Sequence, residues 1–264
     1  MMSFLEKKIK ERVERNKPVL VPYIMAGDGG LEETIRRIVL LQEAGVTAIE
    51  IGIPFSDPVA DGPTIERAGI RALEKGTTLT KVLDKLIEEK NRLTVPLVIM
   101  SYVNPIFQLG LEKFAQKCAE ANIQAVIIPD LPYEEQPIIS PILQTKGIGI
   151  IQLVTITSSN ERVDMLAKNS HGFLYAVTVA GTTGVKRDFS SDVVKNLERV
   201  NKLSPVPVLA GFGISTSKQV EDMSKVVDGV VVGSKIVSWF DDGEEAELLR
   251  FIDEVHSIDN TVRV

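Results

Sequence analysis

Short runs of β-branched and other apolar residues recur along most of the chain, and this repetition limits the fold more than any other feature. Strands that alternate with amphipathic helices predict βαβ units and a parallel sheet. Helical patterns rich in Leu, Glu, Lys and Arg separate the runs, among them residues 32–44, 80–91, 111–121 and 191–200. The eight runs are residues 19–25, 48–53, 97–102, 125–129, 148–154, 173–179, 206–210 and 229–232.

Eight strand–helix units in 264 residues favour a closed (β/α)8 barrel, the TIM barrel, over an open doubly wound sheet. A dinucleotide-binding sheet would carry GxGxxG after its first strand, and residues 26–30 do not supply it. Before the first strand, Leu5, Ile9 and Val13 recur every four residues, which predicts an additional N-terminal helix at about residues 3–16. We expect residues 1–264 to form a single α/β domain of this kind.

Composition and charge exclude several classes of function. A net charge of −6 argues against nucleic acid as the main partner, because phosphate backbones need a basic surface. The single cysteine, Cys118, excludes an internal disulfide, and with only His171 and His256 as imidazole ligands we expect no metal site. No apolar run reaches 18 residues, and the charged N-terminus carries no signal region. We therefore expect a soluble, cytoplasmic protein.

Glu50 is the first candidate catalytic residue, because it lies within a predicted strand. Alternation along residues 48–53 places the isoleucines toward the helices and Glu50 toward the barrel interior. Burial there would raise the pKa of the carboxyl toward a value useful for acid–base chemistry. The alternative is a structural glutamate bonded to backbone groups.

The segment after this strand, residues 54–63, carries three prolines and the two aspartates Asp57 and Asp61. Barrel active sites lie where strands end and the following loops begin, so both carboxylates belong to the predicted active face. Proline stiffens such a loop and can hold a carboxylate in a fixed place. Alternatively, either aspartate is only a turn or helix-cap residue.

A phosphate site is predicted at the ends of the seventh and eighth strands. Glycines in residues 210–215 and at Gly233 would let a phosphate approach backbone N–H groups, unless each is an ordinary turn residue. Ser234 would begin a short helix whose N-terminus favours an anion. Residues 180–188, after the sixth strand, are either a mobile lid or a plain flexible loop. Tyr175, within that strand, has the pattern of a core aromatic.

Several segments resemble the tryptophan synthase α subunit family. Residues 50–63 closely resemble the family's signature, and the resemblance extends from the N-terminal helix to Ile236. It implies a (β/α)8 lyase of tryptophan biosynthesis that cleaves indole-3-glycerol phosphate to indole and glyceraldehyde 3-phosphate, with no cofactor in this chain. Shorter matches are residues 21–23, 100–105, 129–132, 211–215 and 230–234.

The resemblance also implies roles for individual residues. Glu50 and Asp61 match the family's catalytic carboxylates, and Tyr175, which matches a family tyrosine near the site, is grouped with them as a catalytic residue. The aspartate would face the indole N–H, and the glutamate would handle protons at the indole carbon and the glycerol hydroxyl. The implied substrate-binding residues are Tyr23, Tyr102, Gly184, Phe212, Gly213, Gly233 and Ser234.

A second protein is implied as well. Members of the family work with a β subunit that uses pyridoxal phosphate to condense indole with serine, so the resemblance implies an α2β2 hetero-oligomer. Indole is small and apolar and would leak from an open barrel mouth, which gives docking over that mouth a physical reason. Alternatively, the prolines there only shape the active-site loops. The expected interface residues are Pro54, Asp57, Pro58, Asn104 and Pro105.

Three alternative functions remain open. A different phosphate-binding barrel of aromatic amino-acid biosynthesis would need a catalytic lysine or an Asp/Cys pair at other strand ends, which the sequence lacks. A non-catalytic activator subunit would have no need of both Glu50 and Asp61. A stand-alone indole-3-glycerol phosphate lyase would share the chemistry and lack the partner. Departures from the family pattern at residues 153–158 and 180–184 remove no proposed catalytic group.

Overall fold

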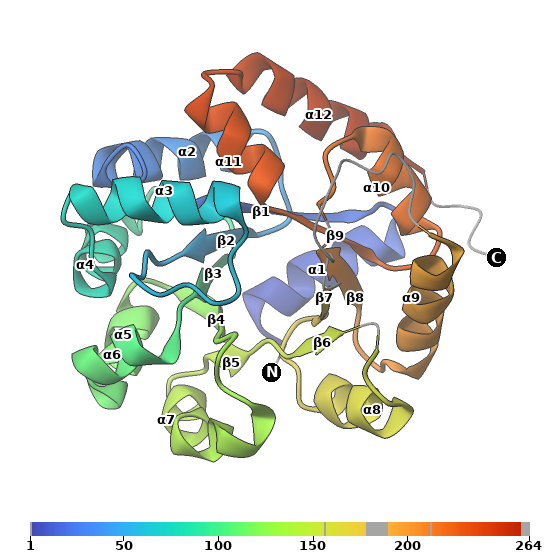
Figure 1. Ribbon diagram of the computed structural model, residues 1–264, viewed down its shortest axis with the longest axis horizontal. Coiled ribbons are helices and arrows are strands. Elements are labelled where there is room, and N and C mark those ends of the chain that lie inside the picture. Colours follow the sequence, from blue (N-terminus) through green and yellow to red (C-terminus); the bar gives the residue numbers. More distant parts are fainter. Residues whose placement is uncertain (1, 156, 178–189, 212, 260–264) are drawn as a thin grey trace.

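The computed structural model describes residues 2–155, 157–177, 190–211 and 213–259. The strands form one sheet in the order β5-β4-β3-β2-β1-β9-β8-β7-β6, and every pairing is parallel (Figure 1). The strands are β1 (Val19–Met25), β2 (Ile49–Gly52), β3 (Leu97–Met100), β4 (Ile123–Ile127), β5 (Gly149–Ile150), β6 (Leu153–Thr155), β7 (Leu174–Val177), β8 (Val208–Gly211) and β9 (Gly229–Val232).

The sheet closes because its two end strands are consecutive in the chain. Only Ile151 and Gln152 separate β5 from β6, so the fifth predicted run is divided rather than continuous. The Ile151 N–H donates to Val126 O of β4 at 2.9 Å, and the Tyr175 N–H of β7 donates to Gln152 O at 2.9 Å. The two residues between β5 and β6 thus form hydrogen bonds to β4 on one side and to β7 on the other, which closes the barrel. The predicted TIM barrel is confirmed.

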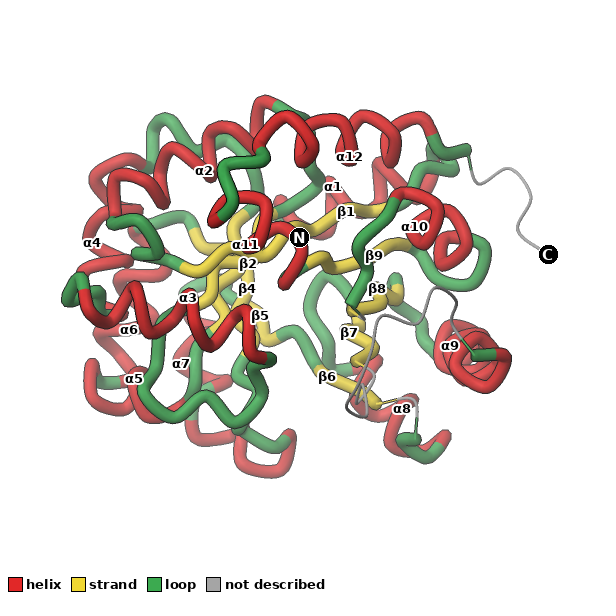
Figure 2. Tube along the Cα trace, turned by 45° about the horizontal axis from the view of Figure 1, so that its top comes forward, coloured by secondary structure: helices red, strands yellow, loops and turns green. Residues whose placement is uncertain are grey.

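Helices surround the strands on the outside of the barrel (Figure 2). The four helical patterns predicted between the strands are confirmed as α2, α4, α6 and α9, with small shifts at their ends. The outer helices are α2 (Leu31–Glu43), α4 (Leu79–Glu89), α6 (Leu111–Glu120), α7 (Ser140–Thr145), α8 (Asn160–Lys168), α9 (Ser191–Leu203), α10 (Ser217–Ser224) and α12 (Glu245–Ser257). Additional ones are α1 (Phe4–Glu14), α3 (Pro63–Glu74), α5 (Val103–Leu109), α11 (Ser234–Asp241) and the 3₁₀ helix Tyr133–Ile138.

Side chains of the strands divide between two apolar layers. On β2, Ile49 and Ile51 pack into the outer core beneath the helices, whereas the preceding Ala48 belongs to the cluster inside the barrel. That interior cluster also contains Val98 of β3 and Phe173, which directly precedes β7. The alternation predicted for this strand is therefore confirmed, and it leaves Glu50 on the inner face.

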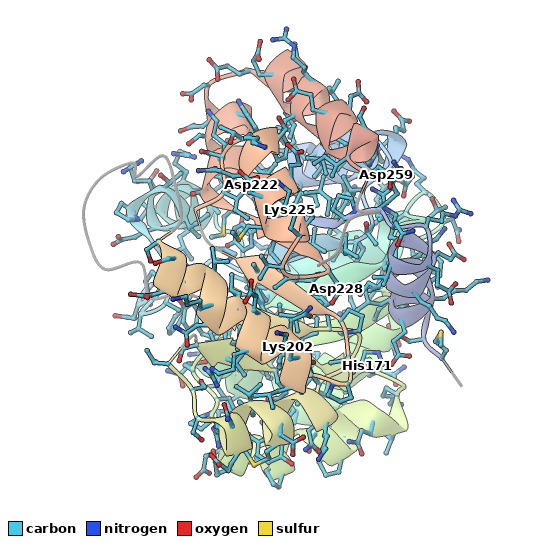
Figure 3. All side chains as sticks on the ribbon, turned by 90° about the vertical axis from the view of Figure 1, so that its right-hand side faces the viewer. His171, Lys202, Asp222, Lys225, Asp228 and Asp259 are labelled. Atoms are coloured by element: carbon cyan, nitrogen blue, oxygen red, sulfur yellow. The ribbon has the colours of Figure 1, made fainter. Side chains whose placement is uncertain are left out.

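The N-terminal helix α1 closes the end of the barrel where the strands begin. Leu5 and Ile9 are buried in the interior cluster, so the apolar stripe seen in the sequence covers the barrel floor. Ser3 caps the helix, and its hydroxyl lies 3.0 Å from Nε2 of His171. Figure 3 shows His171 toward the α1 end of the barrel. This histidine therefore lies at the end opposite the loops that follow the strands.

The long segment between β2 and β3 contains two helices, α3 and α4, and α3 begins at Pro63 immediately after the aspartate-rich loop. One loop expectation needs correction. Asn104 and Pro105 were expected in a loop at the mouth, but they lie in the first turn of α5. Proline is tolerated there because the first turn of a helix leaves its backbone N–H groups without intrahelical acceptors.

In the described part of the chain, no helix is both long enough and apolar enough to cross a membrane.

Replacing Leu5 tests the role of α1. The side chain is fully buried, so Leu5→Ala should lower the free energy of unfolding by about 2–5 kcal/mol through the cavity it leaves. Lys10→Ala, on the exposed side of the same helix, should change it by less than about 0.5 kcal/mol. Urea unfolding measures both, and equal effects would contradict the assignment of α1 as the barrel floor.

Candidate active site

Glu50 is a carboxylic acid buried inside an apolar barrel. Its residue is 3% exposed, and Oε2 has no hydrogen-bond partner among the described residues. Burial, and then the negative charge of Asp61, raise the pKa of Glu50 to about 8. A pKa near 8 favours the protonated carboxyl at neutral pH. The alternative of a structural glutamate bonded to backbone groups does not account for Oε2, which has no such partner among the described residues.

Asp61 approaches from the loop between β2 and α3. It is half-buried, and burial raises its pKa, while hydrogen bonding with Tyr102 opposes the rise. The hydroxyl of Tyr102 also accepts a 3.0 Å hydrogen bond from the Ala60 N–H, and its ring lies 5.3 Å from the ring of Phe55. Tyr102 thus holds this loop at both ends of its exposed part. The structure brings Glu50 and Asp61 close enough for their charges to interact.

Two tyrosines complete the surroundings of Glu50. The pKa values of Tyr23 and Tyr175 are both raised, first by burial and then by nearby carboxylates, so both hydroxyls stay neutral. Tyr23 interacts with the charges of Asp61 and Glu50, and Tyr175 with that of Glu50. The pattern of Tyr175 suggested a core aromatic, whereas the structure places its side chain beside a candidate catalytic group.

Glycines make room for these two tyrosines. A Cβ added to Gly52 would lie 1.9 Å from the Tyr23 hydroxyl oxygen, and one added to Gly211 would lie 2.3 Å from Cε2 of Tyr175. Each glycine ends a strand next to the strand that carries its tyrosine. Sequence reasoning missed Gly52 and grouped Gly211 with the phosphate glycines. The available signal was the position of each glycine two residues after an inward-facing residue, because this spacing places the glycine on the same inner face.

The other end of the candidate site lies where β8 and β9 finish. Helix α11 begins at Ser234 with Gly233 as its N-cap, as predicted, and no side chain caps its first N–H groups. Ser234 and Gly213 are exposed, and a Cβ added to Gly213 would meet no atom within 4 Å. Free backbone donors at a helix N-terminus suit an anion. The predicted residues Gly184 and Phe212 lie outside the described residues.

The predicted interface residues differ in exposure. Asp57 and Asn104 are exposed, Pro58 and Pro105 are half-buried, and Pro54 is buried. Asp130, which sequence reasoning did not single out, accepts a 2.9 Å hydrogen bond from the Val103 N–H at the start of α5. This bond ties the loop after β4 to the helix that carries Asn104. Tyr102, the N-cap of α5, also accepts the hydrogen bond from the Ala60 N–H, so the loop after β2, helix α5 and the loop after β4 form one connected rim.

Side chains able to bind a metal do not gather in the described part of the structure: no group of three or more His, Cys, Asp or Glu residues is placed to hold an ion there. The described carboxylates at the candidate site are Glu50 and Asp61, and Cys118 is buried in the outer core. Two carboxyl groups of this kind can transfer protons and stabilise a positive charge.

Comparisons with known proteins identify the family. The family described as Tryptophan synthase alpha chain matches residues 9–262. The chain belongs to this family. The tryptophan synthase alpha chain of Bacillus cereus is 49% identical over 245 residues, which is 93% of this chain and 95% of that one. The relative from Bacillus mycoides is also 49% identical, over 94% and 96% of the two chains.

Solved structures agree. The tryptophan synthase alpha chain from Legionella pneumophila superposes with a TM-score of 0.88, at 30% identity and full coverage of both chains. A Mycobacterium tuberculosis tryptophan synthase structure matches with a TM-score of 0.89, at 29% identity and 99% and 100% coverage. The tryptophan synthase alpha chain family cleaves indole-3-glycerol phosphate, so the resemblance, the barrel and the lyase activity predicted from the sequence are confirmed.

Gly52→Ala tests the packing of Tyr23. The new methyl group would collide with a buried ring, so the substitution should lower the free energy of unfolding by about 1–3 kcal/mol. Gly62→Ala is the matched control, because its φ of −83° suits alanine and no atom lies within 4 Å of the added Cβ. Thermal or urea unfolding of both variants decides, and an unaffected Gly52→Ala would contradict the described packing.

Proposed function

We propose that this chain cleaves indole-3-glycerol phosphate with Glu50 and Asp61 as its catalytic groups. The observation that carries this assignment is the burial of Glu50 beside a second carboxylate, which raises the pKa of Glu50 to about 8. A pair of carboxyl groups in different environments can divide acid and charge-stabilising roles between them. Tyr175 contacts the same region and is proposed to help shape the space around Glu50.

In the proposed mechanism, the Glu50 carboxyl first protonates C3 of the indole ring, which leaves a positive charge at the ring nitrogen. The carboxylate of Asp61 faces that nitrogen and stabilises the charge. The newly formed Glu50 carboxylate then takes the proton of the adjacent glycerol hydroxyl. The C–C bond breaks as this oxygen becomes the aldehyde oxygen, and the bond's electrons return to the ring. Indole and glyceraldehyde 3-phosphate are the products.

Substrate binding is proposed to divide between two ends of the site. Tyr23 and Tyr102 would enclose the indole ring, since both aromatic side chains are buried near the carboxylates. The phosphate would bind to the N–H groups at the start of α11, around Gly233 and Ser234, and at Gly213. The proposal extends to Gly184 and Phe212 by family resemblance alone.

We also propose that the chain works with a tryptophan synthase β subunit in an α2β2 complex. The relatives of known structure include tryptophan synthase complexes. Exposed Asp57 and Asn104 on the connected rim would contact that subunit, with Pro58 and Pro105 beside them. Pro54 is buried and would support the loop from below. Pyridoxal phosphate would belong to the partner, with no cofactor in this chain. The cytoplasmic location and the single-domain organisation stay predictions.

Substituting the carboxylates tests the mechanism. Glu50→Gln and Asp61→Asn should each reduce kcat by about 10²–10⁴-fold while the fold is retained, because each removes a charge or proton and preserves shape. Indole release from indole-3-glycerol phosphate measures this, and circular dichroism checks the fold. A variant with the wild-type kcat would show that its residue is not catalytic.

The pH profile gives a second readout of the same two groups. Glu50 must be protonated at the start, so kcat/KM should fall as pH rises through about 8. Asp61 must be charged, so kcat/KM should also fall in acid, as pH drops through a pKa raised above its usual range. The charge of Asp61 raises the pKa of Glu50. In Asp61→Asn the alkaline fall of the residual kcat/KM should therefore occur at a lower pH than in the wild type.

Glycerol 3-phosphate tests the phosphate end. It should compete with substrate, and Gly213→Val should weaken its binding by at least tenfold, because the side chain would fill the space beside the backbone donors. The φ of +48° at Gly213 adds strain for valine, so Gly213→Ala serves as the comparison for strain without bulk. Calorimetric titration measures the affinities, and an unchanged affinity in Gly213→Val would contradict this site.

Stimulation by the β subunit tests the partner. The isolated chain should be a weak lyase, and adding a tryptophan synthase β subunit should raise its activity by ordering the catalytic loops. Asp57→Ala and Asn104→Ala should reduce this stimulation far more than basal activity, since both side chains are exposed. A chain that is fully active alone and gains nothing would be a stand-alone lyase. Stimulation of a partner without any cleavage would identify an activator subunit.

A further inference from the structure

A buried aspartate outside the candidate active site carries an ion pair that the mechanism does not use. Asp28 is 3% exposed and lies in the loop between β1 and α2. The guanidinium of Arg71 binds it with two hydrogen bonds, from Nε to Oδ1 at 2.8 Å and from Nη2 to Oδ2 at 3.0 Å. Arg37 adds a third contact at 3.4 Å. Paired donors on one carboxylate fix orientation as well as distance.

This ion pair links the helices at the two ends of the candidate site. They are α3, which follows the Asp61 loop, and α11, which begins at the proposed phosphate end. Arg37 belongs to α2 and Arg71 to α3, and the two helices lie close to α11 in the structure (Figure 1). Arg71 also binds Asp241 at the end of α11 at 3.2 Å, and the guanidinium of Arg37 lies 4.8 Å from the Phe240 ring centroid. Asp28 therefore lies at the junction of α2, α3 and α11.

Helix α3 matters for catalysis because it directly continues the chain that carries Asp61. Pro63 begins the helix two residues after Asp61, and residues 56, 57, 59 and 60 of the preceding loop are exposed. The loop thus has little apolar packing of its own beyond Phe55 and Tyr102. The position of α3 sets where the loop ends, and with it the position of the Asp61 carboxylate.

The apolar face of α3 does not by itself fix that position. Ala68 and Ala72 are the buried apolar residues of this face and pack against Tyr23 and Met25, with Ile65 partly buried beside them. Small side chains thus make up most of the buried contact, and they resist sliding along the helix axis less than interlocking large ones would. The bidentate ion pair of Arg71, which directly precedes Ala72 on the same helix, favours a single register. We propose that the Asp28–Arg71 pair holds α3 in register and so positions Asp61 relative to Glu50. Both are positioning residues, and the role rests on the proposed function of Asp61.

Substitutions separate this role from general stability. Asp28→Asn keeps the shape and removes the charge, while Arg71→Gln leaves Asp28 paired with Arg37 and tests the same link if Asp28→Asn does not fold. Each variant should lower kcat by about 10–100-fold, with less than a threefold change in glycerol 3-phosphate affinity. Because both substitutions break the same Asp28–Arg71 contact, the loss of kcat in the double variant should be smaller than the product of the two single losses.

The matched control is Arg36→Gln. Arg36 lies next to Arg37 on α2 and pairs with Glu33 and Glu245, which joins α2 to α12 without touching Asp28 or α3. It should leave kcat within twofold of wild type. An equal loss of kcat in this control would show that any ion pair near α2 has the same effect, and would overturn the proposal.

Amide hydrogen exchange provides a readout that does not depend on activity. Exchange across residues 54–62, including the Ala60 N–H bonded to Tyr102, should speed up at least fivefold in Asp28→Asn and Arg71→Gln but not in Arg36→Gln. Unchanged exchange in both variants overturns the proposal. Faster exchange with an unchanged kcat would uphold the positioning of the loop and would contradict the catalytic role of Asp61 instead.

Discussion

A carboxyl group held inside an apolar barrel is the constraint on which the site depends. Glu50 is buried on the inner face of β2, with one oxygen lacking a partner in the described structure, so its charged form is disfavoured. The nearby charge of Asp61 disfavours it further. Burial that would be a cost in a structural residue thus favours the protonated form of Glu50, which is the form that the proposed mechanism needs at its first step.

In the proposed mechanism the second carboxylate, Asp61, keeps its charge, and it comes from a different element of the fold. Asp61 precedes an additional helix, α3, that regular barrels would not need between β2 and α4. It remains half-buried and interacts with Tyr102, so it combines access to the site with contact to solvent. The bidentate pair between Asp28 and Arg71 holds α3 against its neighbours. The candidate site therefore depends on strand β2, which carries Glu50, and on the additional helix α3, which follows Asp61.

Much of this arrangement could be predicted from the sequence, because periodic patterns follow directly from secondary structure. The eight strands, the N-terminal helix and the inward direction of Glu50 all follow from spacing. Three features did not follow. The fifth strand divides at Ile151 and Gln152 through hydrogen bonds to different neighbours, the tyrosines rest over Gly52 and Gly211, and Asp28 meets Arg71 across 43 residues of sequence. Each depends on contacts between distant segments, which local patterns do not encode.

Direct titration of the Glu50 carboxyl tests the central claim most closely. Carbon-13 NMR of glutamate labelled at the carboxyl carbon, with the Glu50→Gln variant to assign the resonance, would follow its ionisation across pH 4 to 10. The account predicts a midpoint near 8 that moves to lower pH in Asp61→Asn, because one negative charge is then removed. A midpoint at the ordinary value of about 4.3 for an exposed glutamate would contradict it.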